Sequence, residues 1–328
     1  MIIVTGGAGF IGSNLVAALE AAGESEIVVC DRLRDGPKWR NISKRMIADI
    51  VMPEDLAEYI TAHDGQISTI FHMGAISSTT ATDGDLVFRN NVAFSVDLWK
   101  GCARHGIPLI YASSAATYGN GDEGFDDENT LAHMRTLKPL NLYGWSKWLF
   151  DCWVLRAVEH GDPAPPVWAG LRFFNVYGPN EYHKGAMQSL VSKIISTHRP
   201  GEPVTLFKSH REGIAHGEQM RDFIWVDDVA AVMMWLHRSA ATAGILNLGT
   251  GTARSFADLA AAAIRATGEE PKIEYADMPE SIRSAYQYYT CARMDRLRQL
   301  GYNKDFTPLE DGVTRYVRDF LTSSDPYR

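Results

Sequence analysis

The chain of 328 residues contains few cysteines, and they are widely scattered. There is no CxxC pair and no pair of histidines near any of them, so neither a disulfide framework nor a zinc site is indicated. We therefore expect buried thiols in a reducing cytoplasm and no bound metal. The four positions are Cys30, Cys102, Cys152 and Cys291.

Long apolar runs and an excess of positive charge are also missing. No apolar run approaches the roughly 18 residues that cross a membrane, and the chain begins in an apolar strand without a signal-like segment. The net charge of −8 argues against coating nucleic acid, which needs a basic surface. HExxH and GxSxG motifs do not occur, which argues against metal and serine hydrolases. We expect neither a membrane nor a nucleic-acid partner.

What the sequence does contain is a glycine cluster directly after its first apolar run. The run at 2–4 is followed by glycines whose spacing fits both GxxGxxG and GxGxxG, which predicts a strand, a tight turn and a helix over residues 13–22. Gly6 permits the turn, and Gly9 lets backbone N–H groups approach a pyrophosphate at the helix N-terminus. Gly12 lets the helix lie close to the strand.

A carboxylate follows at the expected distance. A second apolar run, residues 27–30, ends in Asp31, 19 residues after Gly12, where a ribose-binding acid is expected. Strand, glycine turn, helix, strand and acid together form a dinucleotide-binding fingerprint. Asp31 suggests NAD through the ribose 2′-hydroxyl, whereas Arg32, Arg34 and Lys38 are suited to the 2′-phosphate of NADP, so the residues alone leave both cofactors open.

The rest of the chain alternates apolar strands with helices, which predicts an α/β fold: a Rossmann-type doubly wound parallel sheet with a smaller α/β substrate-binding domain. Residues 1–174 and 224–250 are assigned to the dinucleotide-binding domain, and 175–223 and 251–328 to the substrate domain. Ser255 and Asp258 resemble a helix capping box. Surface loops are expected at 120–137 and 208–219. Further strands are expected at 45–50, 68–73, 108–112, 167–173, 204–207 and 245–249, and helices at 53–63, 86–104, 142–159, 185–198 and 227–237.

Tyr143 and Lys147 form the main chemical pair. Their i, i+4 spacing places them on one face of a helix, where the lysine ammonium should lower the tyrosine pKa from about 10. Ser114, just past a predicted strand end, can hydrogen-bond to the reacting oxygen. These groups suit the exchange of an alcohol proton during hydride transfer to or from a nicotinamide.

Several motifs resemble the extended short-chain dehydrogenase/reductases that modify nucleotide sugars. They are TGGAGFIG (5–12), SSAATYG (113–119) and YGWSK (143–147). The segments FHMGAISSTT (71–80), KPLNLYGWSK (138–147) and FFNVYGPNEYHKGAM (173–187) resemble, more narrowly, the ADP-L-glycero-D-manno-heptose 6-epimerase family. The likeness runs from residue 1 to the final helix, and FNVYGP followed by His183-Lys184-Gly185 is its most specific part.

The resemblance implies an isomerase that interconverts ADP-D-glycero- and ADP-L-glycero-D-manno-heptose at C6″, a step of lipopolysaccharide core heptose biosynthesis. Oxidation to a ketone and re-reduction would use tightly bound NADP, in a ring-like homo-oligomer, a pentamer in that family. Ser114, Tyr143 and Lys147 match its active-site triad. Lys184 matches a second acid/base across the sugar, although a diphosphate counter-ion is its alternative reading.

The resemblance also implies binding residues for each ligand. The nucleotide sugar would be contacted by Ser114, Asn175, Ala186, Lys193, Phe207, Lys208, Arg221 and Tyr286, with the fork of Arg221 suited to a pyrophosphate. The cofactor would be contacted by Gly6, Gly9, Phe10, Ile11, Gly12, Asp31, Arg32, Lys38, Asp49, Ile50, Met73, Gly74, Ala75, Ile76, Ser77, Asn90, Tyr143, Lys147, Val176 and Lys184.

Other readings stay open. A nucleotide-hexose 4-epimerase does not need the His183-Lys184 feature, and a non-enzymatic cofactor-sensing or RNA-binding relative would typically lack the Tyr143/Lys147 pair. A 4,6-dehydratase is disfavoured because no Asp-Glu pair follows the active-site threonine. The chain departs from the heptose epimerase pattern around the ligand rim, which leaves the precise sugar open. The departures are Pro53, Met73, Asn180, Ala285 and a longer loop at 208–219.

Overall fold

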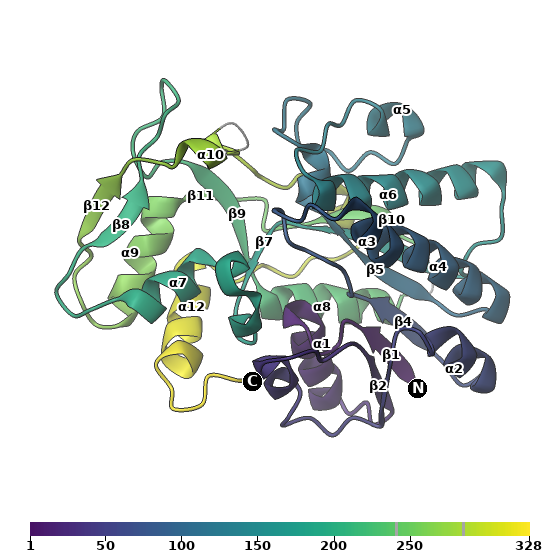
Figure 1. Ribbon diagram of the computed structural model, residues 1–328. Coiled ribbons are helices and arrows are strands. Elements are labelled where there is room, and N and C mark those ends of the chain that lie inside the picture. The colour runs from purple at the N-terminus through teal and green to yellow at the C-terminus, as the bar shows by residue number, and fades with distance from the viewer. Residues whose placement is uncertain (240–241, 284–285) are drawn as a thin grey trace.

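A seven-stranded parallel sheet forms the larger part of the computed structural model, which describes residues 1–239, 242–283 and 286–328 (Figure 1). The strand order is β10-β6-β5-β4-β1-β2-β3, so the chain winds outward in both directions from β1 and β4. The predicted doubly wound fold is thereby confirmed. The strands are β1 (Ile2–Thr5), β2 (Ile27–Cys30), β3 (Asp49–Val51), β4 (Thr69–His72), β5 (Leu109–Ser114), β6 (Trp168–Phe173) and β10 (Gly244–Leu248).

Helices cover both faces of this sheet. The helix α1 packs against α8, and α4 packs against both α2 and α6 (Figure 1). Because both faces are covered, the central strands are buried along their whole length rather than at alternate residues, and Ile3, Val4 and Val28 are fully buried. These helices are α1 (Phe10–Ala21), α2 (Leu56–Ala62), α3 (Gly84–Phe88), α4 (Phe94–His105), α6 (Leu142–His160) and α8 (Val226–His237).

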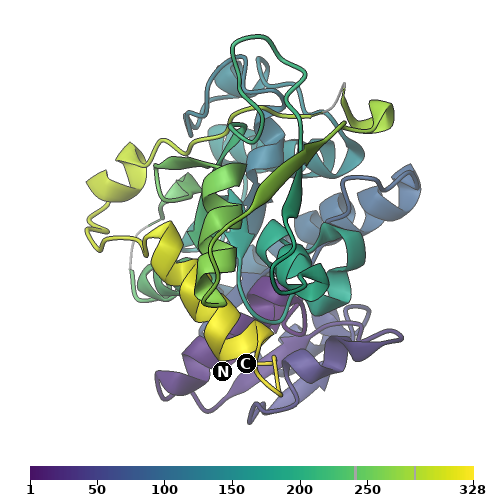
Figure 2. The ribbon, with the colours of Figure 1, turned by 90° about the vertical axis from the view of Figure 1, so that its left-hand side faces the viewer.

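A second buried apolar cluster lies in the part of the molecule that faces the viewer in Figure 2. There α9 packs between α7 and α12, and the capping box of Ser255 and Asp258 at the start of α9 is confirmed. Side chains between Ala292 and Tyr302 pack instead with the large sheet. The strands here are β7 (Asn175–Tyr177), β8 (Val204–Phe207), β9 (Met220–Trp225), β11 (Ala253–Ser255) and β12 (Ile273–Ala276). The helices are α7 (Leu190–Thr197), α9 (Phe256–Ala266), α10 (Glu280–Arg283), α12 (Leu309–Arg315) and a π-helical turn at Tyr316–Leu321. The helix α11 (Asp295–Gln299) packs against β10 of the large sheet.

The prediction of a helix over 185–198 is wrong about where the helix begins. A short 3₁₀ segment covers Tyr182–Met187, and Gly185 inside it has a φ of +53°, a left-handed conformation that a helix cannot continue through. The helix α7 begins only at Leu190, where the Ser189 side chain accepts a hydrogen bond from the Ser192 N–H. The residues before it are thus free to face a cavity.

Three other expectations need smaller corrections. The helix expected at 86–104 is interrupted by a π-helical turn at Arg89–Ala93 between α3 and α4, and the strand expected at 45–50 shortens to β3. The segment 120–137 is not wholly a surface loop, because it contains α5 (Leu131–Met134) and buries Phe125.

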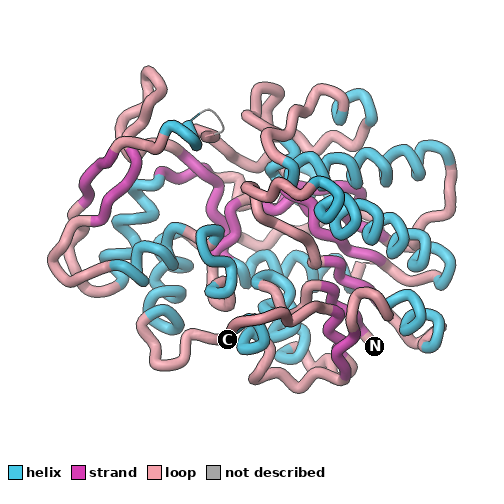
Figure 3. The backbone as a smooth tube through the Cα atoms, in the orientation of Figure 1, coloured by secondary structure: helices cyan, strands magenta, loops and turns pink. Residues whose placement is uncertain are grey.

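The C-terminal residues run back to the first helix of the sheet, as Figures 1 and 3 show. The guanidinium of Arg328 pairs with Asp227 on α8 and donates to the Asn14 side chain on α1 at 3.0 Å. Within the described residues, no helix combines the length and the apolar character that crossing a membrane requires.

Candidate active site

The glycine turn between β1 and α1 is built as the sequence predicted. Gly6 has a φ of +65°, and a Cβ on it would lie 2.6 Å from the Gly74 backbone. A Cβ on Gly12 would lie 2.2 Å from the carbonyl oxygen of Gly6, so only glycine allows α1 to approach the turn this closely. The N-terminus of α1 therefore opens onto a bare backbone cradle of the kind that accepts a pyrophosphate.

This cradle is one wall of a large cavity at the carboxyl ends of the parallel strands. Its volume of about 1410 Å³ exceeds the 300–1,000 Å³ of typical single-ligand pockets, so it has room for two ligands side by side. Both parts of the molecule contribute to its lining. The predicted residues that line it are Gly6, Gly9, Phe10, Ile11, Gly12, Asp31, Arg32, Lys38, Met73, Gly74, Ala75, Ile76, Ser77, Asn90, Ser114, Tyr143, Lys147, Asn175, Val176, Ala186, Lys184, Lys193, Phe207 and Tyr286.

Four predicted contact residues are not among the lining residues. Asp49 and Ile50 lie on the edge strand β3 and are exposed. Lys208 pairs with Asp277 at 3.3 Å. Arg221 is buried, and its guanidinium donates to the backbone carbonyls of Met220 and Gln287 while lying between two aromatic rings. Two of the N–H donors of the fork predicted for a pyrophosphate are thus bonded to backbone carbonyls.

Asp31 is held by two backbone N–H groups and a lysine. Its carboxylate accepts from the N–H groups of Ala8 at 3.0 Å and Arg32 at 2.7 Å, and it pairs with the Lys38 ammonium at 2.5 Å. Asp31 is only 7% exposed, so this pairing offsets most of its charge. The Arg32 guanidinium pairs with Glu54 and donates to the Asn90 side chain. At this wall, therefore, each of the two acids is paired with a cation, Asp31 with Lys38 and Glu54 with Arg32.

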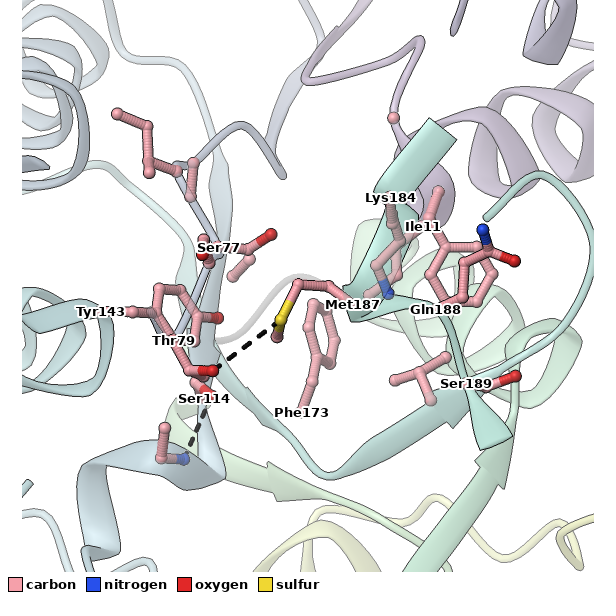
Figure 4. A pocket seen from close by; sticks show the side chains of 18 of the residues that line it. Ile11, Ser77, Thr79, Ser114, Tyr143, Phe173, Lys184, Met187, Gln188 and Ser189 are labelled. Carbon is pink, nitrogen blue, oxygen red and sulfur yellow. Dashed lines mark hydrogen bonds between the residues drawn. The ribbon is translucent and has the colours of Figure 1, made fainter. Parts of the chain in front are cut away.

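Tyr143 and Ser114 meet on one side of the cavity (Figure 4), and Lys147 also lines it. Tyr143 and Lys147 are on α6, and Ser114 ends β5. The Lys147 ammonium donates to the Ala112 carbonyl at 2.7 Å, which anchors it to β5. Burial lowers the pKa of Lys147 to about 8.

The expectation that Lys147 lowers the pKa of Tyr143 is wrong for this structure. Burial raises the Tyr143 pKa above 10, and only its hydrogen bond with Ser114 opposes that rise. The burial of the phenol outweighs this one hydrogen bond, and the Lys147 ammonium donates to the Ala112 carbonyl.

A fully buried ion pair that the sequence analysis missed lies beneath these groups. Asp151, one helical turn after Lys147, accepts from the Ser113 hydroxyl at 2.8 Å and from Arg172 Nε at 3.1 Å, and neither charged side chain is exposed. Arg172 also donates to the Tyr118 hydroxyl at 2.9 Å. The i, i+4 spacing from Lys147 could have drawn attention to Asp151. Its partner Arg172 lies on β6, and local sequence does not predict that the two side chains meet.

Lys184 lies on the other side of the cavity, on the 3₁₀ segment before α7 (Figure 4). Its ammonium is 4.9 Å from the centre of the Phe10 ring and 3.8 Å from a carboxylate oxygen of Glu181. Burial lowers its pKa, and Glu181 opposes that shift. In the view of Figure 4, Met187 stands between this side and the side of Tyr143.

Met187 and Thr79 are lining residues that sequence reasoning did not single out. The Thr79 hydroxyl donates to the Met187 sulfur at 3.8 Å, linking the segment after β4 to the segment before α7. Thr79 lies in the motif at 71–80 and Met187 in the motif at 173–187, and their place in these motifs is the only feature of the sequence that could have indicated them. Gln188, Gln287 and Thr290 also line the cavity unpredicted.

The departures from the family pattern fall mostly near this cavity. Pro53 and Met73 line it. Asn180 is fully buried with a φ of +70°, its side chain donates to the Ser13 hydroxyl, and its oxygen accepts from the Arg328 N–H. Ala285 lies outside the described residues. Among those that the structure does describe, no three His, Cys, Asp or Glu side chains gather as metal ligands.

Comparisons with known proteins agree with this geometry. A model of the NAD dependent epimerase/dehydratase family matches residues 2–249. The chain is 43% identical over 335 residues to an ADP-L-glycero-D-manno-heptose-6-epimerase of Fusobacterium nucleatum and 46% identical over 329 residues to one of Nitratidesulfovibrio vulgaris, with 100% of both chains covered in each case. A crystal structure of the Helicobacter pylori ADP-L-glycero-D-manno-heptose-6-epimerase superposes with a TM-score of 0.77 at 27% identity, covering 97% of this chain and 95% of that one.

Proposed function

The chain belongs to the NAD dependent epimerase/dehydratase family, and from this membership and its cavity we infer that it is an ADP-L-glycero-D-manno-heptose 6-epimerase. It interconverts the two C6″ epimers of the ADP-heptose by transient oxidation and re-reduction. The observation that carries the proposal is the placement of two candidate proton-exchanging groups, Tyr143 and Lys184, on either side of one cavity large enough for a dinucleotide and a nucleotide sugar.

The family implies a nicotinamide dinucleotide, and the residues present fit one. The glycine cradle, in which a Cβ at Gly6 or Gly12 would clash with backbone, leaves room for a pyrophosphate at the N-terminus of α1. Asp31, Arg32 and Lys38 lie where the adenosine ribose would be held, and Tyr143 and Lys147 face the reacting end. When bound, the nicotinamide supplies reversible hydride transfer.

The side chains of this chain move the proton. Ser114 holds the reacting C6″ oxygen, Tyr143 exchanges the hydroxyl proton on one face, and Lys147 orients the ribose side of the site from its anchor on Ala112. Epimerisation exposes the opposite face of the same carbon, which Tyr143 cannot reach. Lys184, across the cavity, then serves as the second acid/base. Residues 1–174 and 224–250 would bind the dinucleotide, and 175–223 and 251–328 the nucleotide sugar.

Replacing Lys184 by methionine tests this assignment, because methionine keeps the length of the side chain and removes its proton exchange. We expect the rate of epimerisation to fall by at least about 100-fold, the size of a positioned acid/base contribution. The amount of cofactor released on denaturation should remain that of the wild type. Loss of the cofactor or a rise in KM alone would instead identify Lys184 as a counter-ion. The rates are measured by proton NMR from each epimer.

We further propose that the preferred cofactor is NADP. Asp31 repels a 2′-phosphate only if its charge is free, and here Lys38 pairs with it at 2.5 Å. The pair therefore favours a phosphate over a bare ribose hydroxyl. The support is this pairing, together with the resemblance of the sequence to an NADP-using family.

Lys38→Met should reverse that preference. Losing one charge-assisted contact of about 1.5–3 kcal/mol weakens NADP binding by about 10- to 100-fold, and the unpaired Asp31 then favours NAD. Kd is measured for both cofactors by titration of cofactor-stripped protein. Lys44→Met is the matched control, because Lys44 pairs with Asp325 and does not line the cavity. An unchanged ratio of the two Kd values would remove Lys38 from cofactor selection.

The activity itself is tested by incubating the purified protein, without added cofactor, with ADP-D-glycero-D-manno-heptose. Proton NMR follows the C6″ epimers, and the cofactor is assayed after denaturation. Interconversion together with released NADP supports both proposals. Released cofactor without interconversion would overturn the substrate assignment and make UDP- and GDP-hexoses, the substrates of a 4-epimerase, the next to be tried.

A further inference from the structure

Glu181 is a fully buried carboxylate that the chemistry described so far does not use. It stands three residues before Lys184, in the segment that leads from β7 to α7. One of its oxygens accepts from the Ser189 hydroxyl at 2.5 Å and from the Tyr316 hydroxyl at 3.0 Å. The other accepts from the Ser189 N–H at 2.6 Å and lies 3.8 Å from the Lys184 ammonium.

The surroundings of Glu181 are arranged for a charged carboxylate. Burying an ionised carboxylate is costly unless it is paired and hydrogen-bonded, and Glu181 has three donors and a cation. It also faces the N-terminus of α7, where the helix dipole stabilises negative charge. Because Tyr316 belongs to the C-terminal helical segment, the carboxylate is fixed from three separate elements and is not a mobile loop acid.

Lys184 depends on this carboxylate for its charge and its place. Its side chain is about a quarter exposed, and the other nearby charge is Lys193 on α7, which does not stabilise an ammonium. Burial lowers the pKa of the neighbouring His183 to about 4, so its imidazole is neutral at pH 7. Burial and Lys193 both lower the Lys184 pKa, and Glu181 is what raises it. The Phe10 ring, 4.9 Å away, gives the ammonium a second fixed neighbour on α1.

We propose that Glu181 is a positioning residue for Lys184, whose carboxylate holds the ammonium at the cavity wall, charged and aimed across the sugar at the face opposite Tyr143. This inference rests on the role given to Lys184 in the proposed function. Glu181 itself exchanges no proton with the sugar. It affects the proton exchange only through Lys184.

The test is Glu181→Gln, which keeps the size of the side chain and an oxygen for the Ser189 N–H but removes the charge. The first readout does not depend on activity: lysine amines are reductively methylated with ¹³C-formaldehyde, and the Lys184 signal, identified by its absence in Lys184→Met, is titrated by NMR. We expect its titration midpoint to fall by about one pH unit or more, as loss of an opposite charge near 4 Å implies.

The second readout is the pH dependence of epimerisation, measured from each epimer. Whether Lys184 acts as base or acid in a given direction, lowering its pKa moves the corresponding limb of the profile to lower pH. We expect kcat to fall about tenfold with KM changed less than threefold. Tyr316→Phe is the matched control, since it removes one donor to the same carboxylate but leaves the charge, and its Lys184 midpoint should equal that of the wild type.

The outcomes distinguish the role proposed for Glu181 from the proposed epimerase function. A Glu181→Gln protein with reduced kcat but an unshifted Lys184 midpoint and unshifted limbs would show a purely structural acid and overturn the inference. A wild-type protein that epimerises no nucleotide sugar would overturn the proposed function, while the Lys184 titration still reports whether Glu181 sets its charge. If Glu181→Gln does not fold, Glu181→Asp takes its place as the test. Its carboxylate is one methylene farther from Lys184, so the Lys184 titration midpoint and kcat should each fall, but by less than in Glu181→Gln. Wild-type values for both would overturn the inference.

Discussion

Tyr143→Phe is expected to reduce epimerisation by about 100-fold or more while the protein keeps its cofactor. Phenylalanine keeps the ring in place on α6 and removes only the hydroxyl that meets Ser114. A positioned acid/base contributes about 10²- to 10⁴-fold, and the Tyr143 hydroxyl is the one that meets Ser114. The loss should appear in kcat, measured by NMR from both epimers.

The control for this variant is Trp145→Phe on the same helix. The Trp145 side chain is 38% exposed and does not line the cavity, so its turnover should match the wild type. Turnover by Tyr143→Phe within a few fold of the wild type would remove Tyr143 from the proton exchange. Because burial raises the Tyr143 pKa, the free protein is expected to carry the neutral phenol at pH 7.

Breaking the buried pair of Asp151 and Arg172 should produce the largest loss of stability. Asp151→Leu leaves the Arg172 guanidinium without its partner at a site with no exposure, and removing one member of such a pair costs about 3–5 kcal/mol. This is a large part of the 5–15 kcal/mol by which folded proteins are typically stable. The free energy of unfolding, measured by urea denaturation with tryptophan fluorescence, should fall accordingly.

The double variant Asp151→Leu with Arg172→Met provides the control for that prediction. Removing both charges leaves no lone ion, so its cost should be clearly smaller than the sum of the two single variants, with the remaining loss arising from the Ser113 and Tyr111 hydroxyls that donated to Asp151. Additive costs would contradict the assignment of an energetically coupled pair.

The local parts of the site were predictable because short spacings fix them. The turn at Gly6 and the close packing at Gly12 follow from backbone sterics, and the shared face of Tyr143 and Lys147 follows from helix periodicity. The position of Asp31 follows from the length of one βαβ unit. The sequence also predicted the capping box at Ser255, which is equally local.

The parts that failed depend on where side chains end up in the folded chain. Gly185 could have continued a helix, but its backbone has a positive φ, and α7 begins only at Leu190 after the cap formed by Ser189. The guanidinium of Arg221 has the right shape for a pyrophosphate, but only the fold brings one of its N–H groups to the Gln287 carbonyl, 66 residues away. The sequence gives the shape and charge of a side chain, but the fold decides which groups that side chain contacts.

The sequence by itself therefore determined the doubly wound sheet, the dinucleotide cradle and the pairing of Tyr143 with Lys147, because each depends on residues a few positions to one βαβ unit apart. Tertiary structure alone decided how deeply those groups are buried and where Lys184 lies in the cavity. Burial raised the Tyr143 pKa against its hydrogen bond with Ser114, and Glu181 gained the Tyr316 hydroxyl from 135 residues away. The reason is physical: backbone geometry propagates along the chain, while burial and long-range pairing exist only after the chain has folded.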